Sequence, residues 1–320
     1  MATAGYDDGA TFDRDRSLLT NHLLPRFGSL PVAGIKTADV REWVVALPLA
    51  PATVALCYQL LGRMLRQAEE DRLIVRSPVT NIKLPRNRRN KQAERWLRRD
   101  ELLRLAETIE PRFRCVILTM GYMGLRFGEV AGLTLERVDL LHGTLEVANS
   151  LQERAGTLRL KEPKTAESRR KLPLPAFMAD ELRVHIGAHP SPAYALDCEE
   201  GTGTRRFLFT GRDGAPLRKT WARRHFKPAA ERAGLSPPPL RPHHLRHTAV
   251  SLLISQGARE KDVQEWCGHS SYQVTMNTYV HLFPERQGQL AELIDRLHRP
   301  PARAPKVATI GGAKEATGSD

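Results

Sequence analysis

The chain has 320 residues, of which 41% are hydrophobic and 27% are charged, and its formal net charge at pH 7 is +13. This composition is that of a globular protein with a real hydrophobic core, and the length predicts two domains. The most apolar stretch, residues 43–58, is interrupted by Pro48 and Pro51, and the N-terminus lacks the apolar segment of a signal peptide. These features exclude membrane-spanning and secreted classes, and we expect a soluble, cytoplasmic protein.

The net positive charge is densest in one segment. Residues 1–80 hold nine basic and nine acidic residues, whereas residues 81–100 hold eight basic and two acidic residues, a net charge of +6. A basic segment between two blocks of ordinary composition is typical of a linker that lies on a phosphate backbone, although many charge runs are only solvated faces. We expect a nucleic acid partner, contacted by Arg86, Arg88, Arg89 and Lys91.

The cysteines are scattered along the chain and form no C-x-x-C pair. They are Cys57, Cys115, Cys198 and Cys267. This pattern predicts reduced thiols in a cytosolic protein, and not a disulfide framework.

The N-terminal region has the periodicity of a helical bundle. A first helix carries Leu18, Leu19 and Leu23 on one face and closes at residues 25–28. Thr37 is a candidate cap for a second helix, and a third, longer helix is expected after Pro51. We therefore predict a small bundle whose apolar residues form its core.

Beyond the linker, helical and strand patterns alternate. Asp100 is a candidate N-cap for a helix, and further helices are expected through residues 115–120 and 127–133. Residues 143–175 alternate apolar and polar side chains and predict one small antiparallel sheet, with turns at Gly156 and near Pro163. Helices return at Ala176, interrupted by a loop at about 188–204, and the last one is expected over residues 288–298.

The predicted fold class is α+β and mainly α, a helical bundle followed by a mainly helical domain with a small antiparallel sheet. The predicted divisions are a DNA-binding bundle at 1–84, a basic linker at 85–99, a catalytic domain at 100–299 and a disordered tail at 300–320.

One set of polar residues has the composition of a phosphoryl-transfer site. Its members are Arg126, Lys164, His243, Arg246, His269 and Tyr279. A guanidinium is a planar fork that matches phosphate oxygens and stays charged at any working pH. The phenol is the candidate nucleophile. The arginines can supply the positive charge that a metal would otherwise provide.

The segments that carry this set resemble the signature boxes of the tyrosine recombinases, the phage integrase family. They are "GLRFGE" at 124–129, "PKTAESRR" at 163–170, "HHLRH" at 243–247 and "GHSSYQVTMNTYVH" at 268–281, within a resemblance that runs from about residue 12 to about residue 298. The boxes occur in the family's order, and each carries its reactive residue.

The resemblance implies a role for each residue. Arg126 and Arg246 would clamp the non-bridging oxygens of the scissile phosphate, and Lys164 would protonate the departing 5′ oxygen. His243 would shuttle a proton, His269 would donate to a non-bridging oxygen, and Tyr279 would form a 3′-phosphotyrosyl bond. Supporting positions are Glu129, which would orient Arg126, and His247, which would be structural. No cofactor or metal is implied.

The resemblance also implies a biological setting. Members of the family act as tetramers on two double-stranded DNA core sites, with a core-site-binding (SAM-like) bundle before the catalytic domain and, in some cases, a directionality or host bending factor. The leading role is integration or excision of a mobile element. The alternatives are resolution of chromosome or plasmid dimers, a type IB topoisomerase, and a DNA-binding remnant that no longer cuts. The chain begins almost at the core-binding helices, so we expect either a simple recombinase that needs only core sites or a shortened copy.

A zinc site is the main competing chemistry. His243 and His247 have the spacing of the H-E-x-x-H signature, but His244 stands where that signature has its glutamate. Cys267 or His269 could supply a third ligand. Compared with the tyrosine recombinases, His244 replaces a usual acidic residue and Cys267 a usual leucine.

Overall fold

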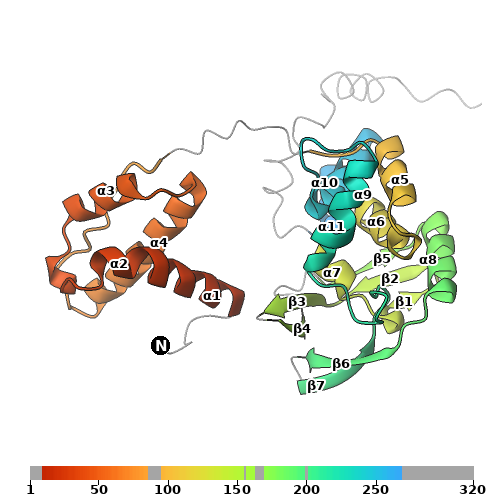
Figure 1. Ribbon diagram of the computed structural model, residues 1–320, viewed down its shortest axis with the longest axis horizontal. Helices are drawn as coiled ribbons and strands as arrows, with labels where there is room; N and C mark the ends of the chain where they lie inside the picture. Colours follow the sequence, from red (N-terminus) through yellow and green to blue (C-terminus); the bar gives the residue numbers. More distant parts are fainter. Residues whose placement is uncertain (1–8, 86–94, 155, 163–168, 199–200, 269–320) are drawn as a thin grey trace, which may run out of the picture.

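The computed structural model describes residues 9–85, 95–154, 156–162, 169–198 and 201–268. Their buried apolar side chains form two large clusters, one from residues 18–65 and one from residues 97–245. Figure 1 shows the N-terminal helices gathered in one body and the later helices and all strands in another. The expected fold class, α+β and mainly α, is confirmed.

The N-terminal body is a small helical bundle. Phe27 and Trp43 pack edge to face in its core, with ring centroids 5.2 Å apart, and the indole Nε1 of Trp43 donates to the carbonyl of His22. The three predicted helices are confirmed, and the first helical stretch ends at Phe27, within the predicted stop. The elements are α1 (Gly9–Leu18), a π-helical segment (Leu19–Leu23), α2 (Leu24–Phe27), α3 (Thr37–Ala46) and α4 (Pro51–Glu70).

Two predicted helix caps are wrong. Helix α3 includes Thr37, and the N–H of the preceding residue, Lys36, donates to the carboxylate of Asp39 at 3.0 Å. The helix for which Asp100 was the candidate cap begins at Arg99, and Glu101 in its first turn accepts the N–H of Arg98 at 2.8 Å. In both helices an acidic residue in the first turn accepts the N–H of the residue that precedes the helix, so the cap residue lies before the predicted one.

The second body is built around helix α6. Most side chains of α6 are buried, and it packs against α5, α8 and α10. The helix predicted through residues 115–120 is confirmed as part of α6, whereas the one predicted over 127–133 ends two residues earlier. The helices are α5 (Arg99–Thr108), α6 (Pro111–Met123), α7 (Phe127–Ala131), α8 (Ala176–Ala188), α9 (Lys227–Arg232), α10 (Pro242–Ser255) and α11 (Glu260–Cys267).

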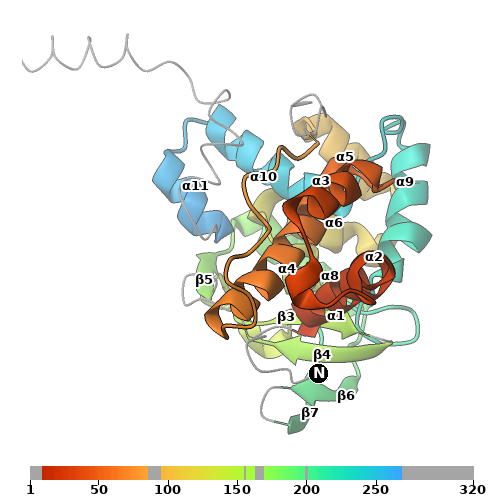
Figure 2. The ribbon, with the colours of Figure 1, turned by 90° about the vertical axis from the view of Figure 1, so that its left-hand side faces the viewer.

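The strands form two sheets, so the prediction of one antiparallel sheet is wrong. The first has the order β1-β2-β5 and is antiparallel, and the second has the order β3-β4-β6-β7, which Figure 2 shows with β7 at its outer edge. Strands β4 and β6 are parallel, and the chain between them, which contains β5 and α8, is long enough for the crossover that a parallel pair needs. The strands are β1 (Val138–Asp139), β2 (Thr144–Val147), β3 (Ser150–Arg154), β4 (Thr157–Lys161), β5 (Arg170–Pro173), β6 (Ala193–Cys198) and β7 (Gly201–Arg206).

The loop predicted at about 188–204 is also wrong, since β6 and most of β7 lie there. Its Gly, Pro and acidic residues suggested irregular structure, but β6 pairs along its length with β7. At the far end of β3, Arg154 forms an ion pair with Asp13 of α1, a contact between the two bodies.

Three other predictions concern the chain as a whole. All four cysteines are free thiols, as expected, and three of them are buried. Within the described ranges, no helix is both long and apolar enough to span a membrane. The helix expected over 288–298 and the tail at 300–320 lie outside the described residues, as does the central part of the linker, 86–94.

Candidate active site

A tight turn between α6 and α7 places Arg126 at the start of a helix. Helix α6 ends at Met123, the next residue, Gly124, has a left-handed φ of +68°, and Arg126 is the extended residue that precedes α7. One turn later, Glu129 accepts the backbone N–H of Arg126 at 2.9 Å and its guanidinium Nη1 at 2.8 Å. The Nη2 of Arg126 donates to the carbonyl of Gly268 at 3.2 Å. Glu129 therefore orients Arg126, and half of that arginine stays exposed.

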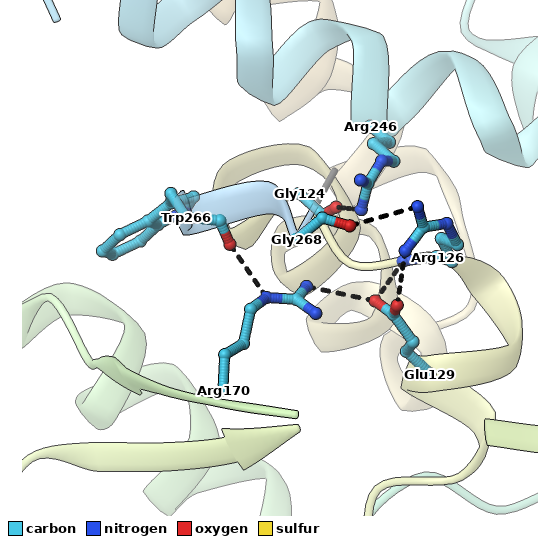
Figure 3. Close-up of polar contacts among 7 residues, drawn as sticks. All are labelled: Gly124, Arg126, Glu129, Arg170, Arg246, Trp266 and Gly268. Atoms are coloured by element: carbon cyan, nitrogen blue, oxygen red, sulfur yellow. Dashed lines mark hydrogen bonds and ion pairs between the residues drawn. The ribbon is translucent and has the colours of Figure 1, made fainter. Parts of the chain in front are cut away.

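Helix α10 brings the second predicted arginine to the same place. Arg246 is 2% exposed, and its Nη1 donates to the carbonyl of Gly124 at 2.7 Å, which Figure 3 shows beside Arg126. Its Nη2 is buried and has no hydrogen-bond partner among the described residues. Burial is the main reason that the pKa of Arg246 is lowered, to about 10, so the group is still a cation at neutral pH.

A third guanidinium, which the sequence reasoning missed, lies beneath the first. Arg170 begins strand β5, and its Nη2 donates to Glu129 Oε2 at 3.1 Å while its Nε donates to the carbonyl of Trp266 at 2.9 Å. A signal for it was available: side chains alternate along a strand, and Arg170 shares the inward face of β5 with Leu172. Inward-facing charged residues are rarely buried without a partner.

The local charge is strongly positive. The guanidiniums of Arg126, Arg170 and Arg246 lie in this cluster, and among the described residues Glu129 is the carboxylate that offsets part of their charge. Burial opposes ionisation of Glu129, but the charges of Arg170 and Arg126 outweigh it and lower the pKa of the carboxyl group. A cluster with this excess of positive charge is suited to bind an anion.

Two of the predicted histidines pack edge to face at the start of α10. The rings of His243 and His247 are perpendicular, with centroids 4.7 Å apart. Burial, together with the charges of Arg246 and Arg126, lowers the pKa of His243, which keeps its ring neutral near pH 7. A neutral imidazole can accept a proton, and His243 lies next to the arginine cluster in the first turn of the helix.

His244 has a structural task. Its Nδ1 accepts the backbone N–H of Arg241 at 3.2 Å, at the start of α10. The acidic residues Asp39, Glu101 and Glu129 fill the same position at the starts of α3, α5 and α7. The histidine at position 244, where the family usually has an acidic residue, therefore still provides an acceptor for the backbone N–H that precedes the helix. Among the described residues, no three His, Cys, Asp or Glu side chains are grouped so as to hold a metal.

The remaining predicted site residues lie outside the described residues. They are Lys164, His269 and Tyr279, together with the linker residues Arg86, Arg88, Arg89 and Lys91. The structure thus brings together five of the predicted residues, namely Arg126, Glu129, His243, Arg246 and His247, and adds Arg170.

Comparison with known proteins gives consistent matches. A sequence model of the phage integrase family matches residues 95–286. The ICEBs1 integrase of Bacillus subtilis is 24% identical over 290 residues, which cover 89% of this chain and 77% of the relative. An integrase of Streptomyces ambofaciens is 27% identical over 282 residues, covering 85% of this chain and 71% of that protein.

Among solved structures, the fold is similar to that of the Tn1549 transposon integrase in complex with transposon right end DNA. The TM-score is 0.76 at 22% sequence identity, and the match covers 92% of this chain and 95% of the other. A lambda integrase dimer bound to a core site matches with a TM-score of 0.62 at 17% identity, covering 84% of this chain and 91% of that one. At these identities the similarity concerns the fold.

Proposed function

The chain belongs to the phage integrase family of tyrosine recombinases, and on that basis we propose that it is a site-specific recombinase that cuts and rejoins DNA through a 3′-phosphotyrosyl intermediate. Its substrate is double-stranded DNA that carries a core recombination site. The reaction needs no ATP, because the covalent link keeps the phosphoester bond for rejoining.

The observation that carries the proposal is the buried guanidinium of Arg246. Its Nη2 lacks a hydrogen-bond partner among the described residues, and an unpaired charged donor is costly in a protein interior. The exposed half of Arg126 lies beside it, and Glu129 balances only part of the local positive charge. An anionic oxygen between Arg126 and Arg246 supplies the missing partner, and a phosphodiester offers two such oxygens.

The proposed cleavage step assigns each proton. The phenolic oxygen of Tyr279 attacks the phosphorus, and its proton passes to the neutral ring of His243. A bond forms between this oxygen and phosphorus as the bond from phosphorus to the 5′ oxygen breaks. Lys164 gives that leaving oxygen a proton, and His269 donates a hydrogen bond to a non-bridging oxygen.

The charge that develops on the phosphoryl oxygens is stabilised by guanidinium groups. Glu129 holds Arg126, and the carbonyl of Gly124 holds Arg246, so both side chains need little rearrangement when substrate binds. Preorganised charge of this kind is usually the largest contribution to such a reaction.

The two bodies have separate proposed tasks. Residues 1–84 would bind the core site, residues 85–99 would follow the phosphate backbone, and residues 100–299 would carry the chemistry. Four copies would assemble on two sites and exchange strands in pairs. A directionality or host bending factor would be an additional partner.

We propose integration or excision of a mobile element as the biological role. The integrase relatives support it, because they align with most of this chain. Resolution of chromosome or plasmid dimers uses the same chemistry, and the DNA that flanks the gene distinguishes the two: an element boundary with direct repeats indicates integration.

A suicide substrate tests the proposal. A nicked duplex that carries the core site from the element boundary is incubated with the protein, and covalent adducts are resolved on a denaturing gel. The wild-type chain and Tyr272→Phe should form the adduct, and Tyr279→Phe should bind the duplex without forming it. An adduct that persists in Tyr279→Phe contradicts the assignment. Cleavage should also survive EDTA, whereas loss of cleavage on chelation would favour a metal-dependent reaction.

A further inference from the structure

Arg170 connects three elements around the candidate site. It extends from strand β5, bonds to Glu129 of α7, and bonds to the carbonyl of Trp266 in α11, as Figure 3 shows. Its side chain is only 7% exposed, so it lies beneath the exposed face of Arg126 and is not placed to meet DNA itself. Any influence of Arg170 on a DNA phosphate has to pass through its neighbours.

Two of the groups that contact Arg170 also contact Arg126. One is Glu129, whose Oε1 accepts from the Arg126 guanidinium and whose Oε2 accepts from Arg170. The other is the end of α11, where the carbonyl of Gly268 accepts Arg126 Nη2. Arg170 therefore bonds to Glu129 and to the helix end beside Gly268, the two groups that accept hydrogen bonds from the guanidinium of Arg126.

The site around Arg170 is shaped for a guanidinium. A Cβ built on Gly268 would lie 2.7 Å from Arg170 Nη1, and the φ of Gly268 is +64°, so a glycine is required there. A planar fork can reach Glu129 and Trp266 at once, whereas the compact ammonium of lysine offers no such spacing. The charge of Arg170 also helps to lower the pKa of Glu129 against the effect of burial.

We propose that Arg170 is a positioning residue for DNA cleavage, which holds Glu129 and the end of α11 so that Arg126 is aimed at the scissile phosphate. This inference rests on the proposed recombinase function. It predicts that Arg170→Lys slows covalent cleavage by roughly 10- to 100-fold, the range expected when a hydrogen bond to a charged group is lost. Affinity for the core-site duplex should stay unchanged.

The test compares two suicide substrates in single-turnover cleavage. One has the natural phosphate, and in the other a methyl group replaces one non-bridging oxygen of the scissile phosphate, which makes it neutral. If Arg170 acts by aiming the charge of Arg126, its loss matters less when the phosphate carries no charge. The rate ratio of wild type to Arg170→Lys should therefore fall severalfold on the neutral substrate. A general loss of structure would slow both substrates equally.

The matched control is Arg169→Lys, the same change at the adjacent residue, which is exposed and pairs with Glu146. It should cleave both substrates at the wild-type rate. If Arg170→Lys cleaves as fast as wild type, or is slowed equally on both substrates, the inference is wrong.

If Arg170→Lys fails to fold, as judged by thermal unfolding, Glu129→Gln replaces it in the same comparison, because it keeps the shape of the link to Arg126 but removes its charge. Equal slowing on both substrates by that variant overturns the inference. Absence of a Tyr279-dependent adduct from the wild-type chain is a separate outcome, which overturns the proposed cleavage and the inference with it.

Discussion

Gly124 and Cys267 are in direct contact across the site: a Cβ built on Gly124 would lie 2.8 Å from the Sγ of Cys267. The contact brings the end of α6 against the end of α11, and the carbonyl of the same glycine accepts the hydrogen bond from Arg246. Backbone conformation, packing and the orientation of a candidate catalytic arginine therefore all depend on one residue without a side chain.

Gly124→Ala should be strongly destabilising. A left-handed φ costs a non-glycine residue about 1–2 kcal/mol, and overpacking against the buried thiol adds about 1–3 kcal/mol. Gly156→Ala is the matched control, because Gly156 also has a positive φ but a Cβ there would meet nothing within 4 Å. Chemical denaturation measures both variants. Equal losses of stability would mean that the Cys267 side chain moves aside and that its contact with position 124 adds little to the free energy of unfolding.

Arg246→Lys should retain DNA binding and lose cleavage. Lysine cannot bond to the Gly124 carbonyl and at the same time present a planar fork to a phosphate. Loss of one preorganised donor typically lowers the rate by about 10²- to 10³-fold. Arg183→Lys, on the exposed face of α8, is the control and should cleave normally. The measurement is the single-turnover rate of adduct formation. A near-normal rate in Arg246→Lys would show that the Arg246 guanidinium does not contribute to cleavage.

Stability should fall as the pH drops below about 6.5, in part because of His185. Burial, with the nearby charges of His189 and Arg112, lowers the pKa of His185 to about 4, and its Nε2 donates to the carbonyl of Leu208. Between pH 6.5 and 4, His185 is protonated in the unfolded chain but stays neutral in the folded chain. The free energy of unfolding should therefore drop by on the order of 3 kcal/mol over this window.

Urea denaturation at a series of pH values tests the role of His185. His185→Gln should flatten the pH dependence below 6.5, whereas His142→Gln, which removes an exposed imidazole, should leave it in place. If His185→Gln keeps the wild-type slope, the acid sensitivity arises from other groups.

The linker should control the salt dependence of DNA binding. Replacing Arg86, Arg88, Arg89 and Lys91 by alanine removes up to four phosphate contacts, which should reduce the slope of log K against log salt by up to about 3.6. A variant with lysine at the three arginine positions keeps the charge and should keep most of the slope. Titrations of a core-site duplex at several salt concentrations provide the measurement. A slope that does not change would mean that this segment faces solvent.

Local patterns were sufficient to predict much of the fold. Helical spacing predicted the three helices of the bundle, and the "GLRFGE" and "HHLRH" segments identified Arg126 and Arg246, which the structure places around the ends of α6 and α11. These predictions succeeded because the signals are confined to a few turns of chain.

Long-range pairing was not accessible from local patterns. The parallel pairing of β6 with β4 joins segments separated by a whole helix, so residues 193–198 looked like a loop. Arg170 was missed for the same reason. Its partners, Glu129 and Trp266, are far away in the sequence, and only the inward alternation of β5 hinted at burial. Thr37 and Asp100 were wrongly predicted as caps because Asp39 and Glu101 accept the N–H of the residues that precede these helices, Lys36 and Arg98.

Mapping the covalent attachment site tests the proposed chemistry most directly. The adduct formed with a suicide core-site duplex is digested with nuclease and protease, and the nucleotide-bearing peptide is sequenced by mass spectrometry. We predict a single attachment, through the 3′ phosphate, on the phenolic oxygen of Tyr279. Attachment to another residue, linkage through a 5′ phosphate, or DNA cleavage without any covalent peptide would contradict the account.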